Sequence, residues 1–255
     1  MNNFQTHLDY FENYVNEYIN TYQEPCLNLK KEHTYHVVEN AIQIAENLMV
    51  SEKEMYIAKL TALYHDLGRF YQYSKYKTFA DRLSENHAYI AVKLLKKNKL
   101  FLQEPKEIQQ QVLCAIVLHN VAFFPKNLKK EFILQSNIIR DADKIDILKI
   151  MAHNFSNTLP EKDSVLLHVK DEPNNFTPLI LEQAIHKQPI KYTDLKFAND
   201  FKLLLIGWFY SLNFTISKKL VIKSNVLTII LNSLPSEKKI NEFKEMVQKD
   251  FIVYS

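Results

Sequence analysis

Histidine and aspartate side chains that could bind a metal recur through the first part of this 255-residue chain. The clearest pair is the doublet His65-Asp66 in ALYHDLGRF, which follows an apolar stretch with helical spacing. Neighbouring side chains on a helix diverge by about 100°, so both can reach one ion only where the helix ends. Imidazole nitrogen together with carboxylate oxygen suits manganese, iron, zinc and related divalent ions. An isolated HD dipeptide is common, however, and a capping aspartate beside a half-buried histidine would also explain it.

Further residues of the same kind make a metal site the better interpretation. His33 lies in KEHTYHVV, at the first turn of a predicted amphipathic helix, and His87 and His119 each lie at the end of a predicted helix. Asp143 follows in RDADKID. A closed tetrahedral site needs only four ligands, so six candidates favour two neighbouring ions that share Asp66 as a bridge.

Two of these positions have competitors in the sequence. His36 lies one helical turn after His33 and could replace it as the ligand. Asp141 and Asp146 compete with Asp143 in the same way. The remaining histidines have no ligand-like context, and we interpret them as surface or structural residues: His7, His153, His168 and His186.

The elements that must position these residues are helices. Apolar residues recur at spacings of three and four along most of the chain, as in amphipathic helices, so we predict an all-α protein. Ser51 and Glu54 predict a capping box at the start of the helix that ends near His65. The stretch 67–85 breaks the pattern and predicts a long, functional loop. The irregular stretch 154–177 predicts a linker or an insertion. Helices are expected at about 4–22, 34–49, 53–65, 86–97, 105–119, 131–149, 178–187, 195–222 and 236–249.

The composition excludes several classes of protein. Only two glycines occur, whereas Rossmann and P-loop proteins need glycine where the backbone approaches phosphate. The net charge of +3 is too small to indicate nucleic acid or a membrane surface as a partner. Two cysteines do not make a disulfide scaffold, and no apolar run approaches the roughly 18–20 residues that span a bilayer. We therefore expect a protein of the reducing cytoplasm.

At these residues the chain resembles the HD superfamily of metal-dependent enzymes. The resemblance covers roughly residues 30–150 and rests on HTYHV at 33–37, HDLGR at 65–69, FADRLSENH at 79–87, HN at 119–120 and DADKID at 141–146. The later segment WFYSLNFTIS, at 208–217, is similar to one bacterial subgroup of the superfamily. The resemblance implies an HD-domain-like helical bundle with additional C-terminal helices. One domain would span residues 1–255, with a metal-binding core at about 30–150 and a helical extension at about 178–255 packed on it.

The resemblance also implies a ligand set and a cofactor. His33, His65, Asp66 and Asp143 match the residues that bind a metal in such proteins. His87 and His119 match the extra histidines of members that often hold two ions. Relatives often have arginine in place of His36, which favours His33. The expected cofactor is one or two divalent ions per chain, of manganese, iron, magnesium, zinc, nickel or cobalt.

The expected activity is that of a metal-dependent phosphohydrolase, acting on a nucleotide or a similar small phosphorylated substrate through metal-activated water. Asp66 would hold the nucleophilic water, and Arg69 would clamp a phosphate group. Substrate contacts are expected from Arg69, Arg82, Lys77, Lys144 and Asn120. The alternatives are salt bridges for the arginines, a solvated face for the lysines and a helix cap for Asn120.

Two other functions would use the same residues. Some relatives with six ligands hold two irons and activate oxygen, and a nucleotide-binding regulatory module would keep the site without turnover. The cationic residues near the motif favour hydrolysis of an anionic substrate. We expect neither a membrane nor a nucleic acid as a partner, and a homodimer stays open.

Overall fold

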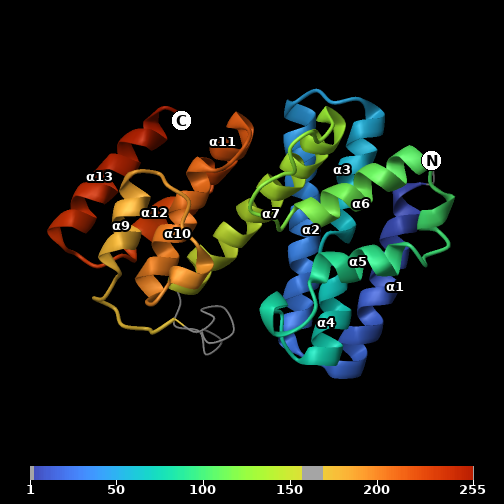
Figure 1. Ribbon diagram of the computed structural model, residues 1–255, viewed down its shortest axis with the longest axis horizontal. Coiled ribbons are helices and arrows are strands. Elements are labelled where there is room, and N and C mark those ends of the chain that lie inside the picture. Colours follow the sequence, from blue (N-terminus) through green and yellow to red (C-terminus); the bar gives the residue numbers. More distant parts are fainter. Residues whose placement is uncertain (1–2, 157–168, 255) are drawn as a thin grey trace. The chain divides into compact units, whose positions relative to one another are not determined.

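The computed structural model describes residues 3–156 and 169–254, and its regular secondary structure is helical (Figure 1). Within these ranges the only β pairing is an isolated bridge between Lys170 and Phe197. The prediction of an all-α protein is therefore confirmed. The chain divides into two compact units, Met1–Asp146 and Ile147–Ser255, which are described separately below.

The first unit is built around helix α3, Glu52–Tyr64, which contacts three other helices (Figure 1). Every residue of α3 from Leu60 to Tyr64 is buried, which explains why the sequence is apolar over such a wide arc there. Helix α3 packs against α1, α2 and α6, and α4 packs against α1 and α5. The helices of this unit are α1 Phe4–Tyr22, α2 Pro25–Asn47, α3, α4 Gly68–Tyr76, α5 His87–Leu95, α6 Lys106–Leu118 and the first part of α7 Lys130–Ser156.

The boundaries of α3 and α2 follow from local chemistry. The predicted capping box is confirmed, because Glu54 N–H donates to Ser51 Oγ at 3.3 Å and Ser51 N–H donates to the Glu54 carboxylate at 2.8 Å. Helix α2 begins at Pro25, earlier than predicted, since proline is well suited to the first turn of a helix. His33 consequently lies about two turns inside α2, and its expected place in the first turn was wrong.

The prediction of a long loop at 67–85 was wrong over its first half. Residues Gly68–Tyr76 form helix α4, although glycine and aromatic residues have modest helix propensity. Phe70 and Gln72 are buried and α4 contacts α1 and α5, so tertiary packing stabilises this helix. Between α4 and α5 only a 3₁₀ turn forms, at Asp81–Leu83. We call residues 77–86 the α4–α5 loop.

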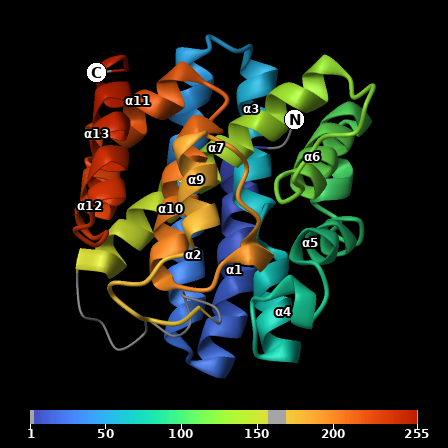
Figure 2. The same ribbon diagram turned by 60° about the vertical axis from the view of Figure 1, so that its left-hand side comes forward.

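The second unit is organised around α10, Ala198–Tyr210, which contacts α9 and α12 (Figure 2). The helix predicted at 195–222 is interrupted: α10 ends at Tyr210 and α11 begins at Thr215, because Phe214 has an extended backbone. The other helices are α9 Pro178–Ile185, α11 Thr215–Lys223, α12 Val226–Asn232 and α13 Lys238–Ile252. Whether residues 178–255 pack on the metal-binding core stays a prediction. His168 and part of the irregular stretch 154–177 lie outside the described residues.

None of the helices in the described part of the chain combines the length and the apolar character that crossing a bilayer requires.

Candidate metal centre

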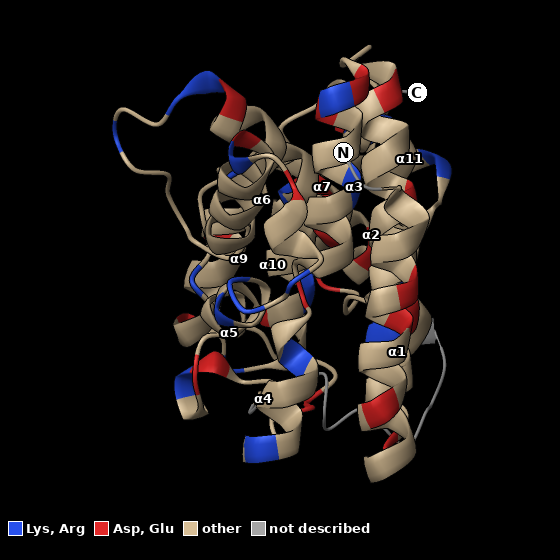
Figure 3. Ribbon diagram, turned by 90° about the vertical axis from the view of Figure 1, so that its right-hand side faces the viewer, with Lys and Arg blue, Asp and Glu red and all other residues tan. Residues whose placement is uncertain are grey.

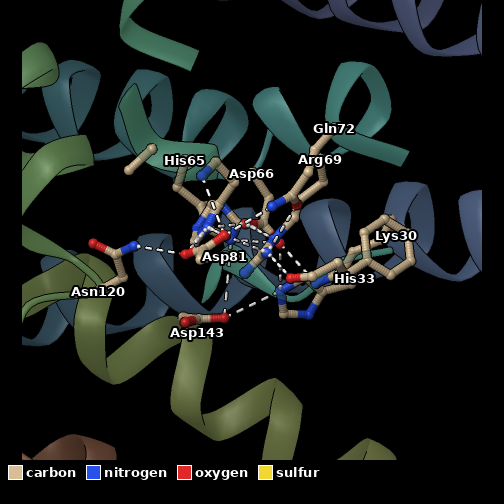
Figure 4. A network of polar contacts seen from close by, with 12 residues as sticks. Lys30, His33, His65, Asp66, Arg69, Gln72, Asp81, Asn120 and Asp143 are labelled. Carbon is tan, nitrogen blue, oxygen red and sulfur yellow. Dashed lines mark hydrogen bonds and ion pairs between the residues drawn. The ribbon is translucent and has the colours of Figure 1, made fainter. Parts of the chain in front are cut away.

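Six side chains from the first unit converge at one place, and Figure 4 shows the network that surrounds them. His65 and Asp66 lie in the short turn between α3 and α4, which lets both point inward. The other four come from α2, the first residue of α5, the residue after α6, and α7: His33, His87, His119 and Asp143. We call these six the ligand cluster. Asp143 is 18% exposed and the other five are buried, so solvent reaches the cluster on the side of Asp143.

The ligand cluster consists of two groups of three. His33, His65 and Asp143 form the first triad, and each offers an atom within 4.8 Å of the others. The Nε2 atoms of His33 and His65 lie 3.1 Å and 3.9 Å from Asp143 Oδ1. Two imidazole nitrogens and a carboxylate oxygen in this arrangement can hold one divalent ion.

Asp66, His87 and His119 form the second triad, which meets the same distance condition. The His87 Nε2 atom lies 3.3 Å from Asp66 Oδ1 and 3.0 Å from His119 Nε2. The other carboxylate oxygen, Asp66 Oδ2, lies 3.8 Å from the Nε2 atoms of both His33 and His65. Asp66 thus presents one oxygen to each triad, which is the geometry of a bridging ligand.

Backbone carbonyls fix the orientation of two of the histidines. His65 Nδ1 lies 2.8 Å from the carbonyl oxygen of Ala62, and His119 Nδ1 lies 2.6 Å from that of Ile116. A carbonyl oxygen can only accept a hydrogen bond, so Nδ1 carries the proton in both rings. In the neutral imidazole, Nε2 then keeps its lone pair and points into the cluster.

Buried or half-buried carboxylates fix the other two histidines. His33 Nδ1 donates to Asp146 Oδ2 at 2.7 Å, and His87 Nδ1 donates to Asp81 Oδ2 at 2.9 Å. A carboxylate behind a histidine is the usual support of a metal ligand, because it fixes the tautomer and increases the basicity of the metal-facing nitrogen. All four histidines therefore direct Nε2 to the centre, and each neutral ring presents it there as a bare nitrogen.

These inward nitrogens fit a bound cation. The Nε2 atoms of His33 and His65 are buried and have no hydrogen-bond partner. The Nε2 atoms of His87 and His119 face each other at 3.0 Å with their outer nitrogens already engaged. Burial lowers the pKa of both His87 and His119 to about 4, so neither ring carries an extra proton at neutral pH. Opposed lone pairs in a buried site call for a positive charge between them, and the residues present fit a metal ion.

The carboxylates of the cluster are ionised. Burial raises the pKa of Asp66, but Lys30 and Arg69 outweigh this effect and hold the pKa well below its usual range. The pKa of Asp143 is also lowered, since its contact with His33 outweighs burial. Burial and Lys30 lower the pKa of His33, yet Asp143 and Asp146 outweigh both and raise it. Each triad thus contains one ionised carboxylate, as a cation site requires.

Arg69 lies beside the cluster and is held by several acceptors. Its Nε lies 3.3 Å from Asp66 Oδ1, and its Nη1 donates to the carbonyl of Phe79, to Gln72 and to Asp81. Arg69 therefore forms salt bridges with Asp66 and Asp81, the alternative that the sequence left open for it. Asn120 is exposed and donates to Asp81 Oδ2 at 3.4 Å.

The other three residues expected to contact the substrate, Lys77, Arg82 and Lys144, have environments different from those of Arg69 and Asn120. Lys77 is exposed, and its ammonium group lies 4.0 Å from the centre of the Tyr22 ring, a cation–π contact with α1. Arg82 is exposed in the 3₁₀ turn of the α4–α5 loop. Lys144 is half-buried, and burial lowers its pKa to about 8.

The structure places His33, and not His36, in the ligand cluster. His36 is largely exposed, and its Nδ1 lies 3.1 Å from Asp146 Oδ1. Asp146 therefore supports both histidines from outside, while Asp143 faces the centre. His7 is buried against Tyr64 and Glu104. His153 and His186, which also lie outside the ligand cluster, are exposed.

Sequence reasoning missed four residues around the cluster: Lys30, Gln72, Asp81 and the supporting role of Asp146. Lys30 Nζ donates to Asp66 Oδ2 at 2.7 Å. Lys30 and Asp146 lie one helical turn from His33 and Asp143, so helical spacing could have found them. Asp81 lies in a loop, where no periodicity connects it with His87.

Comparison with known proteins agrees with this geometry. Residues 31–148 match the family model of the HD domain, a range that contains all six residues of the ligand cluster. No curated protein and no solved structure matches the chain. Residues 31–148 of this chain are therefore an HD domain.

Proposed function

We propose that this protein is a phosphohydrolase that uses two divalent ions, one in each triad, to cleave a small phosphorylated substrate such as a nucleotide. The observation that carries the proposal is the position of Asp66, whose two oxygens face different triads. Two ions bridged in this way can stabilise the attacking and the leaving oxygen of a phosphoryl group together.

The charge of the loaded site favours an anionic substrate. Four neutral histidines and two carboxylates carry two negative charges, and two divalent ions leave the cluster with two positive charges in excess. Around it, the cations Lys30 and Arg69 offset the carboxylates of Asp81 and Asp146. A phosphate dianion would neutralise the remaining charge, which is the complementarity that a phosphohydrolase needs.

The protein residues have distinct roles in this proposal. When bound, the ions would lower the pKa of water toward neutrality and polarise a phosphoryl oxygen. Asp66 orients the site, because Lys30 donates to one of its oxygens and Arg69 approaches the other. Lys30 is 24% exposed and Arg69 16% exposed, so both lie where an anion can approach from solvent.

Weaker contacts would come from residues farther out. The charged side chains of α4 are Arg69 and Lys75, whereas those of α1 are all acidic (Figure 3). Asn120 and Lys144 lie next to the ligand residues His119 and Asp143 in the sequence, and Arg82 and Lys77 lie in the α4–α5 loop. We propose that they attract and orient the phosphate.

The test is turnover by the metal-reconstituted protein on a panel of phosphate monoesters, nucleotides and dinucleoside polyphosphates. We expect hydrolysis that depends on added divalent metal and release of phosphate or a nucleotide product. Turnover of none of these substrates, together with oxygen consumption by the iron-loaded protein, would favour an oxygenase and contradict the proposal. Arg82→Ala should raise KM for an anionic substrate with metal content preserved, and unchanged kinetics would remove Arg82 from the site.

A further inference from the structure

We propose that Asp81, in the α4–α5 loop, is a positioning residue that sets the metal-facing tautomer of His87 and fixes Arg69 beside the bridging carboxylate. One side chain would then assemble both the second metal site and the adjacent cation. The inference rests on the proposed metal centre, but it concerns a residue that neither faces the ions nor belongs to the ligand cluster.

Asp81 is the point where several hydrogen bonds of the loop meet. Its Oδ1 accepts from Arg69 Nη1 at 3.1 Å, from Gln72 Nε2 at 2.9 Å and from the backbone N–H of His87 at 3.2 Å. Its Oδ2 accepts from His87 Nδ1 at 2.9 Å and from Asn120 at 3.4 Å, and the same His87 Nδ1 lies 3.0 Å from Oδ1. Donors from α4, α5 and the residues after α6 thus converge on this one carboxylate and fix its position.

These contacts determine what an amide would do in the same place. In Asp81→Asn the side-chain oxygen must stay where Oδ1 is, because three N–H groups from Arg69, Gln72 and His87 point at that position. The new NH₂ group then takes the place of Oδ2 and faces His87 Nδ1. That nitrogen keeps as its acceptor only the oxygen at the Oδ1 position, 3.0 Å away, for which three other N–H groups compete, while an N–H group now points at it. The substitution therefore favours the tautomer with the ring proton on Nε2, which blocks the nitrogen that faces Asp66 and His119.

The position of the carboxylate also couples the loop to Arg69. Arg69 Nη1 donates to the carbonyl of Phe79 as well as to Asp81, so two residues of the α4–α5 loop hold the guanidinium. Its Nε approaches Asp66 Oδ1, the oxygen that belongs to the second triad. Asp81 thus fixes a ligand of the second ion and the cation next to it with one set of hydrogen bonds.

The experiment measures metal binding and the tautomer of His87 in the full-length protein. After removal of metal by a chelator, titration with Mn²⁺ by calorimetry gives stoichiometry and affinity. Nitrogen-15 NMR of the imidazoles reports which nitrogen carries the proton. In the wild type we expect about two equivalents and a proton on Nδ1 of His87. In Asp81→Asn we expect a shift of the proton toward Nε2 and an affinity of the second ion lower by about 10–100-fold.

Glu85→Gln is the matched control, because it removes a carboxylate from the same loop whose partner is the exposed Lys93. It should keep both ions and the wild-type tautomer. Asp81→Asn with two ions at wild-type affinity would overturn the proposal. So would a wild-type His87 protonated on Nε2, a result that does not depend on whether any variant folds. Neither measurement uses a substrate, so a failure of the hydrolase proposal would not affect this inference. A failure of this inference would likewise not affect the hydrolase proposal.

Discussion

At the scale of single residues, the four histidines of the ligand cluster are supported in two different ways. His65 and His119 donate to backbone carbonyls of the helices that carry them, and no substitution of another side chain removes those acceptors. His33 and His87 donate instead to side-chain carboxylates. Each triad contains one histidine of each kind. The two ions should therefore be separately sensitive to the two supporting carboxylates.

For the first triad this predicts the effect of Asp146→Asn. The amide supports the Nδ1–H tautomer of His33 less well and removes a negative charge close to the ion, so the affinity of the first ion should fall by about 10–100-fold. Calorimetric titration with Mn²⁺ measures it. His36→Gln is the control, because it removes only the exposed partner of Asp146 and should leave the affinity nearly unchanged. Equal affinities in Asp146→Asn and the wild type would contradict the supporting role.

The sequence allowed the ligand residues to be predicted, but little of what surrounds them. Residue type and order predicted His65 directly, while the resemblance to the HD superfamily favoured His33 over His36 and Asp143 over its neighbours. The structure brings these three together with the other three. Asp81 could not be predicted, because its link to His87 depends on the path of a loop. The partners of Arg69 were equally hidden, since they include a backbone carbonyl.

At the scale of elements, Gly68 controls how closely α4 approaches α5. A Cβ atom at this position would lie 2.1 Å from the carbonyl oxygen of His87 and 2.8 Å from the backbone nitrogen of Ala91. Both atoms belong to the backbone of α5, so they cannot move away alone. The absence of a side chain at Gly68 therefore lets His87 approach Asp66, two residues before the glycine in the sequence.

Gly68→Ala should consequently separate α4 from α5. We expect a loss of about 1–3 kcal/mol in the free energy of unfolding, as for other overpacked interiors, together with weaker binding of the second ion. Chemical denaturation and Mn²⁺ titration measure the two effects. Gly207→Ala is the control: the nearest atom would be 4.0 Å away, and alanine in a helix interior should add about 0.5–1 kcal/mol. A Gly68→Ala protein as stable as the wild type would contradict the close-contact explanation.

The sequence predicted a helix well where local residues determine it, and poorly where tertiary packing does. Helix α1, which has a clear apolar period, and helix α3, whose start is marked by the capping box, were predicted close to their actual ends. Helix α4 was missed because its residues favour a helix only when Phe70 and Gln72 are buried against neighbours. The break before α11 was missed because no glycine or proline marks it and apolar residues, Leu212 and Phe214, recur through it.

At the scale of the whole molecule, all six residues of the ligand cluster belong to the unit Met1–Asp146. The second unit, Ile147–Ser255, supplies none of the ligand residues found in the described part of the chain. Residues 1–156, which end with α7, should therefore fold and bind two ions. Circular dichroism and metal analysis of this fragment test the expectation. A folded fragment that binds no metal would show that residues after 156 complete the site.

Stability should also depend on pH through His7, which joins α1 to α3 and to the turn before α6. Its ring contacts Tyr64 at 2.8 Å and Glu104 at 3.1 Å, and burial lowers its pKa although Glu104 opposes the shift. A histidine whose pKa is lower when folded stabilises the protein above the unfolded pKa of about 6.5, and this contribution is lost as the pH falls below it.

The quantity to compare is the free energy of unfolding of the wild type and of His7→Gln. The contributions of the other histidines to its pH dependence are the same in both proteins and cancel in the difference. At pH 7.5 the variant should be less stable by about 1–3 kcal/mol, because buried hydrogen bonds are lost. The difference should shrink as the pH falls from 7 to 5. Denaturant unfolding at several pH values measures it, and a difference that grows toward low pH would mean that His7 is protonated in the folded protein.

The most direct test of the two-ion centre is the metal content per chain, measured by mass spectrometry on protein purified without chelator or nickel affinity and then reconstituted with manganese or iron. We expect close to two equivalents in the wild type and none in Asp66→Ala, because Asp66 faces both triads. One equivalent would contradict the bridged pair. No metal after reconstitution, or a metal-replete Asp66→Ala protein, would contradict the centre itself.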